Sequence, residues 1–438
     1  RADQPAPAIR RRQLLVLDAF LRPHQTLVFR STSSDLGGRR GMRDPGLELL
    51  GRLLEASHLL APDEIVAAVA RAGRALDAED VAIYLVDYEQ TLLVPLPDGT
   101  DRTPLEIDTT LAGRAFAAVA VQDADTESGR RLWLPLLDGA ERLGVLGLTL
   151  PGIDEALRVR CTWLATLVAE LLMTKSQYTD SYFLTRRRKP MSLAAEMQWQ
   201  LLPPLTFVTP RVVIAGLLEP AYEVAGDAFD YALNGDTAHL AVIDPVGHDL
   251  TASVLAAVTV GSYRHSRRAG LGLADTYAVA DQAIATEFGG ERFVTGQFAQ
   301  LDCVTGRLQW LNAGHPLPLL VRRAKVVDTL ACHPVPPLGL GLGEPEIAAA
   351  ALEPGDRVLF YTDGVIEARD LAGEPFGEAR LADLLVRETL AGQPAAETMR
   401  RLAHAILAHQ GRTPRDDATM VFLEWPGPPP WSLKRRRL

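Results

Sequence analysis

The sequence has little cysteine and lacks any long uninterrupted apolar run. Its 438 residues include three cysteines, Cys161, Cys303 and Cys332, whose spacing suits neither a disulfide framework nor a metal-binding cluster. A membrane-spanning helix needs about 20 consecutive apolar residues, and no stretch of this chain approaches that length. These absences predict a protein of a reducing compartment with no membrane partner, and we expect it in the cytoplasm.

Clustered basic charge is missing from the body of the chain. The net charge is -10, although residues 1–43 hold nine Arg against three Asp and residues 427–438 hold Lys434 and three Arg. The residues between these ends therefore carry a net charge of about -20. Because binding to a phosphate backbone needs clustered Lys and Arg, we expect no nucleic-acid partner. Both ends are interpreted as loose, solvated segments.

The chain is rich enough in apolar residues to fill more than one core. Apolar residues make up 47% and charged residues 23% of the sequence, which is a globular composition. A length of 438 residues predicts two or three domains. We expect an α/β (α+β) protein with a basic leader over 1–43, a first domain over 44–154, a helical linker over 155–200, a second domain over 201–426 and a basic tail over 427–438.

The first domain shows the pattern of a helix-flanked antiparallel sheet. Apolar periodicity and turn residues predict helices from Pro45 and over 62–75 and 111–119, and strands over 81–86, 91–96, 132–137 and 143–150. Asp138-Gly139 between the last two strands is typical of a hairpin turn.

This order, with "IDTTLAGRAFAAVAVQ" and "RLWLPLLDGAERLGVLGLTLP", resembles a GAF domain. No cluster of Cys or His indicates haem, bilin or metal binding there. Two interpretations stay open for this domain: it binds a small-molecule ligand as a sensor, or it is a ligand-free dimerisation or spacer domain.

A heptad-like stripe runs through the start of the linker. Leu157, Leu164 and Leu171 repeat every seven residues, with Cys161 and Val168 between them. Such a stripe is typical of a helix that pairs with its twin in a homodimer. Packing of the helix against its own domain explains the stripe nearly as well.

Four segments of the second domain place aspartates where a strand pattern meets a turn. They contain Asp227, Asp244, Asp363 and the pair Asp416-Asp417. Carboxylates that converge from strand ends, without a thiolate or paired histidines, suit Mg²⁺ or Mn²⁺. Two such ions about 3.5 to 4 Å apart can clamp a phosphoryl group, whereas the same carboxylates without ions repel one another. The sequence therefore predicts a two-ion centre.

These segments stand in order among further motifs, which are "QLLPP", "EVAGDAFD", "VIDPVGHDLTASVLA", "TGQFAQLDCVTGRLQWLNAGHPLP", "LEPGDRVLFYTDGVIEA" and "DDATMVF". Together they resemble the PPM-type (type 2C-like) protein serine/threonine phosphatases, in the branch of sporulation stage II protein E and the sigma-factor regulators. The resemblance implies a C-terminal αββα sandwich with two Mn²⁺ or Mg²⁺ ions in a cleft. It also implies hydrolysis through a metal-bound water, without a phosphoenzyme.

Carried over residue by residue, the resemblance assigns roles to seven positions. The expected metal ligands are Asp227, Asp244, the backbone carbonyl of Pro245, Asp363 and Asp416, with Asp417 as an adjacent ligand or a turn former. The four aspartates Asp227, Asp244, Asp363 and Asp416 are also the expected catalytic residues, because they hold the ions that act on water. His248 is expected either to assist proton transfer to the leaving oxygen or only to hydrogen-bond its loop.

Five further positions are expected to have no catalytic or ligand-binding role. Asp249 is expected to cap a helix that begins near Leu250, and His315 is expected to belong to a strand-ending turn. Gly339, Gly341 and Gly343 alternate with leucines, but no P-loop lysine follows them, so we expect no nucleotide site.

The resemblance implies a phosphatase that removes phosphate from serine or threonine of a regulatory protein, of the anti-anti-sigma-factor type, under control of the GAF-like domain. Some neighbours of the aspartates depart from the family pattern. Ala225 and Asp249 stand where glycines are usual, and Ile243 stands where glycine or alanine is common. These departures keep an alternative open, a catalytically weak or inactive module that sequesters a signalling partner.

Overall fold

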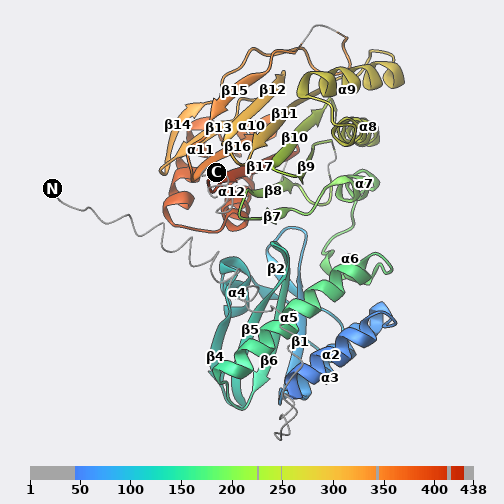
Figure 1. Cartoon of the computed structure of the whole chain (residues 1–438), viewed down its shortest axis with the longest axis vertical. Helices are drawn as coiled ribbons and strands as arrows, with labels where there is room; N and C mark the ends of the chain where they lie inside the picture. The colour runs from blue at the N-terminus through green and yellow to red at the C-terminus, as the bar shows by residue number, and fades with distance from the viewer. Residues whose placement is uncertain (1–44, 224–225, 248, 342–344, 412–415, 429–438) are drawn as a thin grey trace, which may run out of the picture.

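The computed structural model describes residues 45–223, 226–247, 249–341, 345–411 and 416–428. The predicted leader and most of the predicted tail therefore lie outside the described residues. The described chain forms an N-terminal module (residues 45–186) built on one sheet and a sandwich (residues 193–425) built on two, stacked end to end in Figure 1. Within those ranges, none of the helices combines the length and apolarity needed to cross a bilayer.

The sheet of the N-terminal module is antiparallel throughout and has the strand order β3-β2-β1-β6-β5-β4. Its strands are β1 (Asp80–Val86), β2 (Leu92–Pro95), β3 (Leu105–Glu106), β4 (Gln122–Thr126), β5 (Gly129–Asp138) and β6 (Glu141–Leu150). The predicted hairpin is confirmed as β5 and β6, whose turn contains Gly139 at φ 60°. The short strands β3 and β4 were not predicted, because neither has a run of alternating apolar residues.

Helices cover both faces of this sheet. They are α2 (Pro45–Ser57), the 3₁₀ turn η2 (Pro62–Glu64), α3 (Ile65–Arg74), α4 (Leu111–Ala118) and α5 (Glu155–Ser176). Strand β1 shows how the faces divide: Ile83 and Leu85 point into the core beneath α3 and α5, while Tyr84 and Val86 pack with Phe116 of α4. This alternation follows from the two-residue period of a strand.

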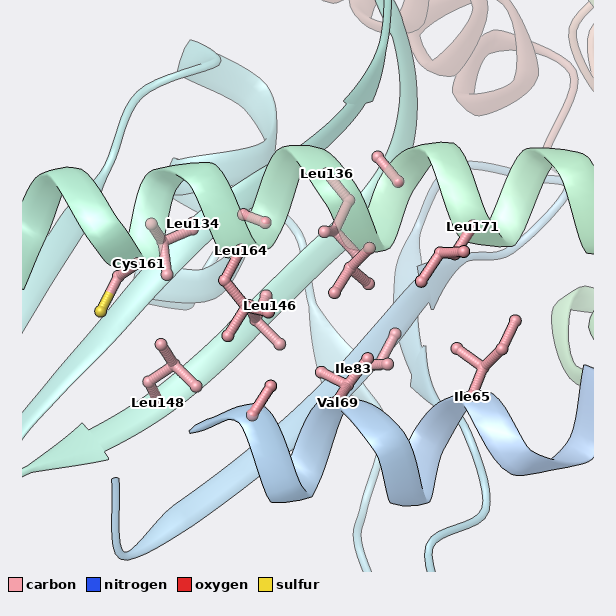
Figure 2. Packing of buried hydrophobic residues seen from close by; sticks show 14 of the residues in the cluster. Ile65, Val69, Ile83, Leu134, Leu136, Leu146, Leu148, Cys161, Leu164 and Leu171 are labelled. Carbon is pink, nitrogen blue, oxygen red and sulfur yellow. The ribbon is translucent and has the colours of Figure 1, made fainter. Parts of the chain in front are cut away.

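The linker stripe is buried inside its own module. Cys161, Leu164 and Val168 are fully buried and Leu171 nearly so, in the core that α5 shares with α3 and β6. Figure 2 shows Leu164 and Leu171 of α5 directed at the side chains of the sheet. Of the two interpretations of this stripe, packing of the helix against its own module accounts for these residues.

After α5 the connection continues as α6 (Ser181–Arg186) and α7 (Leu193–Leu201). Helix α7 begins after Ser192, whose side chain accepts a hydrogen bond from the N–H of Ala195 and so caps the helix.

The sandwich consists of two antiparallel sheets. One has the order β15-β12-β11-β10-β9 and the other the order β14-β13-β16-β17-β8-β7. The strands are β7 (Thr206–Val208), β8 (Val213–Glu219), β9 (Ala228–Asn234), β10 (Thr237–Pro245), β11 (Val294–Asp302), β12 (Arg307–Ala313), β13 (Leu319–Arg322), β14 (Lys325–Thr329), β15 (Ala348–Ala351), β16 (Asp356–Tyr361) and β17 (Ala418–Trp425).

Helices cover both outer faces of the sandwich. Helices α8 (Leu250–Arg268) and α9 (Leu273–Phe288) lie on the first sheet, and α11 (Glu378–Leu390) and α12 (Ala395–His409) on the second, while the short α10 (Asp363–Glu367) follows β16. Strand β10 sends Leu240 and Val242 between the sheets, and Ala241 and Ile243 towards α8 and α9. The predicted α/β class and αββα sandwich are confirmed.

Candidate metal centre

The aspartates predicted from the sequence come from adjacent strand ends of both sheets. Asp227 directly precedes β9 and Asp244 lies near the end of its partner β10. Asp363 follows β16, and Asp417 precedes β17, which pairs with β16. The backbone N–H of Asp227 donates to Oδ2 of Asp417 at 3.2 Å, a contact that joins the two sheets at this edge.

Two residues that sequence reasoning missed hold Asp227 in place. The hydroxyl of Thr362 donates to Oδ2 of Asp227 at 2.7 Å and accepts the N–H of Thr419 at 2.9 Å. The side chain of Gln198 on α7 donates to the backbone carbonyl of Asp227. The only sequence signal for Thr362 is its place before Asp363, and none indicates Gln198.

A glycine in the Thr-Asp-Gly turn allows the β16 and β17 ends to approach each other. A Cβ atom on Gly364 would lie 1.9 Å from the carbonyl oxygen of Asp417, a distance that real atoms do not reach. Gly226 is similar but less crowded, since its Cβ would lie 3.1 Å from the carbonyl oxygen of Gly247. The glycines therefore serve the close packing of the aspartate-bearing segments, beyond ordinary turn formation.

Carboxylates dominate the electrostatics of this edge. Burial raises the pKa of Asp244 to about 9, with further contributions from the charges of Asp227, Asp363 and Asp416. Burial and the charge of Asp416 raise the pKa of Asp417 to about 7, and burial and the charge of Asp417 raise the pKa of Asp227 well above its usual value. The groups that act most strongly on these aspartates are acids and not Lys or Arg, so the edge favours a bound cation.

The available donors fit a hard divalent cation. All five aspartates offer carboxylate oxygens, which Mg²⁺ and Mn²⁺ prefer. Asp417 is 5% exposed, and its Oδ1 is buried without a hydrogen-bond partner in the described residues. As placed, however, no three His, Cys, Asp or Glu side chains among the described residues are arranged to enclose an ion. The carboxylates are neighbours that would have to move closer around an ion.

The aspartates differ in their access to solvent. Asp227 and Asp417 are buried, Asp244 is half-buried, and Asp363 and Asp416 are exposed. The centre therefore opens to solvent on the side of Asp363 and Asp416. The sequence ranked Asp416 above Asp417, but of the two it is Asp417 that contacts Asp227.

The remaining predicted positions lie around the centre. Pro245 is buried as the last residue of β10. The side chain of Asp249 caps α8 by accepting the N–H of Ala252 at 3.0 Å, as predicted. His248 lies outside the described residues, as does Gly343.

His315 is buried in a hydrogen-bonded turn. It is 6% exposed, its N–H donates to Oδ1 of Asn312, and its ring Nδ1 lies 3.1 Å from the hydroxyl of Thr295. Burial lowers the pKa of His315 to about 3, so its ring is neutral at ordinary pH. This placement supports the structural role expected from the sequence.

The N–H groups of the glycine-rich loop point at a carboxylate. Those of Gly339 and Gly341 both donate to Oδ1 of Asp281. They are therefore used within the chain and are not directed at a phosphate.

Fold and site together define a class, the αββα sandwiches that bring carboxylates from both sheets to one edge. Residues 234–426 match the family model of stage II sporulation protein E (SpoIIE). The recognition of the C-terminal part as a PP2C-type phosphatase domain related to SpoIIE is confirmed, over somewhat less than half of the chain. The likeness of the N-terminal module to a GAF domain stays a prediction.

One curated protein is similar to part of the chain. The chain is 26% identical over 265 residues to protein IcfG of Synechocystis sp., a match that covers 53% of this chain and 39% of IcfG. The chain thus spans about two fifths of the length of this curated relative.

Two solved structures are also similar to part of the chain. The RsbU and RsbW domains of a Mycobacterium tuberculosis protein are 29% identical, with 51% of this chain and 64% of that chain covered and a TM-score of 0.44. The SiaA-PP2C domain of Pseudomonas aeruginosa is 22% identical, with 53% and 94% covered and a TM-score of 0.46.

Proposed function

We propose that this chain is a Mn²⁺- or Mg²⁺-dependent protein phosphatase that hydrolyses phosphoserine or phosphothreonine on a regulatory protein. The observation that carries the proposal is the gathering of five aspartates at one edge of the sandwich, where the charges that act most strongly on them are other carboxylates. The SpoIIE match supports the same reaction class.

The chain's own residues divide the work at this centre. Asp227, Asp244, Asp363, Asp416 and the carbonyl of Pro245 would hold two ions. The ions would supply positive charge that offsets the negative charge of the phosphoryl group in the transition state. Thr362 and Asp417 orient Asp227 through the hydrogen bonds described above. Asp363 and Asp416 lie on the exposed side, where a phosphoprotein would reach the centre.

The substrate we propose is a phosphorylated regulatory protein of the anti-anti-sigma-factor type, a choice supported by the SpoIIE match. The proposed domains are a GAF-like sensor over 44–154, a linker over 155–200 whose first helix α5 packs in the core of the sensor, and a phosphatase domain over 201–426. In this proposal the GAF-like domain controls the activity, with or without a small-molecule ligand, and the protein works in the cytoplasm.

The test is metal-dependent hydrolysis by the full chain, with p-nitrophenyl phosphate and a phosphoserine peptide as substrates. We expect turnover with Mn²⁺, loss with a chelator, and a decrease of about 100-fold or more in Asp244→Asn, since removing a ligand costs at least as much as removing its supporting residues. Asp236→Asn is the matched control, because Asp236 is exposed at the opposite end of the β9–β10 hairpin. Hydrolysis that persists in Asp244→Asn or in chelator would refute the proposal.

A second candidate function is a phosphatase-fold module that binds and sequesters a partner without turnover. The observation that favours it is that no three acidic, His or Cys side chains in the described parts of the chain are already placed to hold an ion. Calorimetry should then detect partner binding while no phosphate is released at any Mn²⁺ concentration. Any metal-dependent release would exclude this candidate.

A further inference from the structure

A buried ion cluster joins the N-terminal module to the sandwich. Its centre is Glu397, which lies in the first turn of α12. The side chain of Glu397 has no exposed surface. Arg142, at the start of β6 in the N-terminal module, donates to Oε2 of Glu397 at 3.1 Å and to the carbonyl of Ala396 at 3.1 Å. The side chain of Arg142 is 4% exposed, so both partners are removed from water.

The same face of α12 holds the N-terminal module at further points along the helix. Arg400 donates to both carboxylate oxygens of Glu397, at 2.9 and 2.8 Å, and also to Asp108 and to the carbonyl of Gln90. The ring Nε2 of His404 lies 3.0 Å from the carbonyl oxygen of Glu89. The β1–β2 turn, the segment before α4 and the start of β6 therefore all contact one face of one helix.

Glu397 is charged in this environment. Burial alone would raise its pKa, but Arg400, Arg142 and Arg401 together lower the pKa to about 2. A buried carboxylate with three arginine partners is stable only while those partners stay in place, because an uncompensated buried charge is costly. The cluster therefore specifies one docking position of the N-terminal module on α12.

The C-terminal end of α12 lies next to the candidate metal centre. Ala403 and Ile406 pack against Ala418 and Met420 at the start of β17. Residues of the last turns of α12 also line a small pocket together with Asp416. Helix α12 has 15 residues and spans about 22 Å, so it connects the docked module to the segment that carries Asp416 and Asp417.

We infer that Arg142 and Glu397 are positioning residues for the metal centre. Docking of the N-terminal module on α12 between Ala396 and His404 fixes this helix, and its last turns set the place of Asp416 relative to the aspartates of the other sheet. When the N-terminal module undocks, α12 becomes free to move. Binding of the ions must then order this helix, and because that ordering costs free energy, the affinity for the ions falls. The inference rests on the proposed function in one respect, that Mn²⁺ binds at these aspartates.

Arg142→Met in the full chain tests the inference. Glu397 keeps Arg400 and Arg401 in this variant, so the sandwich retains a compensated charge. We expect Mn²⁺ binding, measured by calorimetry and by the EPR signal of free Mn²⁺, to weaken by about fivefold or more, the low end of couplings between sites. Amide hydrogen exchange over 395–409 should become faster, and Arg142→Lys should recover part of the affinity.

Arg131→Met is the matched control, since Arg131 is an arginine of the same sheet whose ion pair with Asp80 lies inside the N-terminal module. It should leave Mn²⁺ affinity unchanged. If Arg142→Met does not fold, Asp108→Asn removes an outer partner of Arg400 and should act in the same direction. Unchanged affinity in the interface variant that folds, or an equal loss in Arg131→Met, would overturn the inference.

Binding and turnover separate this inference from the proposed function. A wild-type chain that binds Mn²⁺ without hydrolysing phosphate refutes the phosphatase, while the positioning role is still decided by the binding data. A wild-type chain that binds no Mn²⁺ overturns both.

Discussion

At the scale of single residues, the candidate centre depends on one glycine as much as on its carboxylates. Gly364 leaves the space that the carbonyl of Asp417 occupies, and Asp417 in turn accepts the N–H of Asp227. The Thr362 hydroxyl links Asp227 to the first strand residues of β17. Close backbone approach is a general reason for glycine at such a position.

Gly364→Ala should therefore separate the Asp363 and Asp417 segments. We expect Mn²⁺ affinity to fall by about 10-fold or more, the range seen when residues that orient metal ligands are lost, as measured by calorimetry. Gly261→Ala is the control, because nothing lies within 4 Å of the added Cβ on α8. Similar affinities in the two variants would contradict the role assigned to Gly364.

At the scale of elements, α5 shows how one pattern serves two different structures. Its apolar stripe satisfies the spacing of a coiled coil, yet the residues lie in the core of the N-terminal module. The other face of α5 carries Thr162, Trp163 and Thr166, which are exposed. The helix is therefore a structural part of the module and begins the connection to the sandwich from a fixed position.

Leu164→Ala should destabilise the N-terminal module by about 3 kcal/mol, the cost of an unfilled cavity at a fully buried leucine. Denaturant unfolding of the full chain, followed by hydrogen exchange in β6, measures this loss. Thr166→Ala on the exposed face of the same helix should change the free energy of unfolding by no more than about 0.5 kcal/mol. A change of oligomeric state with intact stability in Leu164→Ala would instead indicate the coiled-coil interpretation.

At the scale of the whole molecule, the junction between the modules gathers acids as well as arginines. Glu219, at the end of β8, is 6% exposed. Burial raises its pKa to about 8, with smaller contributions from Glu89 and Asp87 of the N-terminal module. Glu219 also lines the pocket that Asp416 shares with α12, so the docked module changes the electrostatics next to the candidate centre.

This shift predicts a pH dependence of stability. The unfolded chain loses the Glu219 proton near its ordinary pKa of 4.5, while the folded chain keeps it up to about pH 8. The unfolded state then binds fewer protons across that window, so stability falls as pH rises through it and levels off above pH 8. Glu219→Gln should remove this contribution.

The variant should match wild type near pH 4.5 and exceed its free energy of unfolding by about 1 to 4 kcal/mol at pH 8.5. Urea unfolding at several pH values measures the difference. Glu287→Gln, on the exposed face of α9 away from the junction, should show no such trend. A constant difference between wild type and Glu219→Gln at all pH values would contradict this assignment.

Much of the fold and part of the site follow from local patterns in the sequence. Alternation of apolar residues predicted β1 and the β5–β6 hairpin, and the capping residue Asp249 predicted the start of α8. Aspartates at strand ends predicted which segments come together, and Asp227, Asp244, Asp363 and Asp417 do lie at the ends of paired strands. These features are visible because strand period, helix caps and turns depend on residues that are close along the chain.

Only the tertiary structure determined the contacts between residues far apart in the chain. The use of the α5 stripe, the contact of Asp417 with Asp227, the support from Thr362 and Gln198 and the Arg142–Glu397 cluster belong to this group. An arginine at position 142 and a glutamate at position 397 each look like ordinary surface charges in the sequence. They become a buried pair because folding brings two separate surfaces together. The spacing of residues along the chain does not show which surfaces will meet.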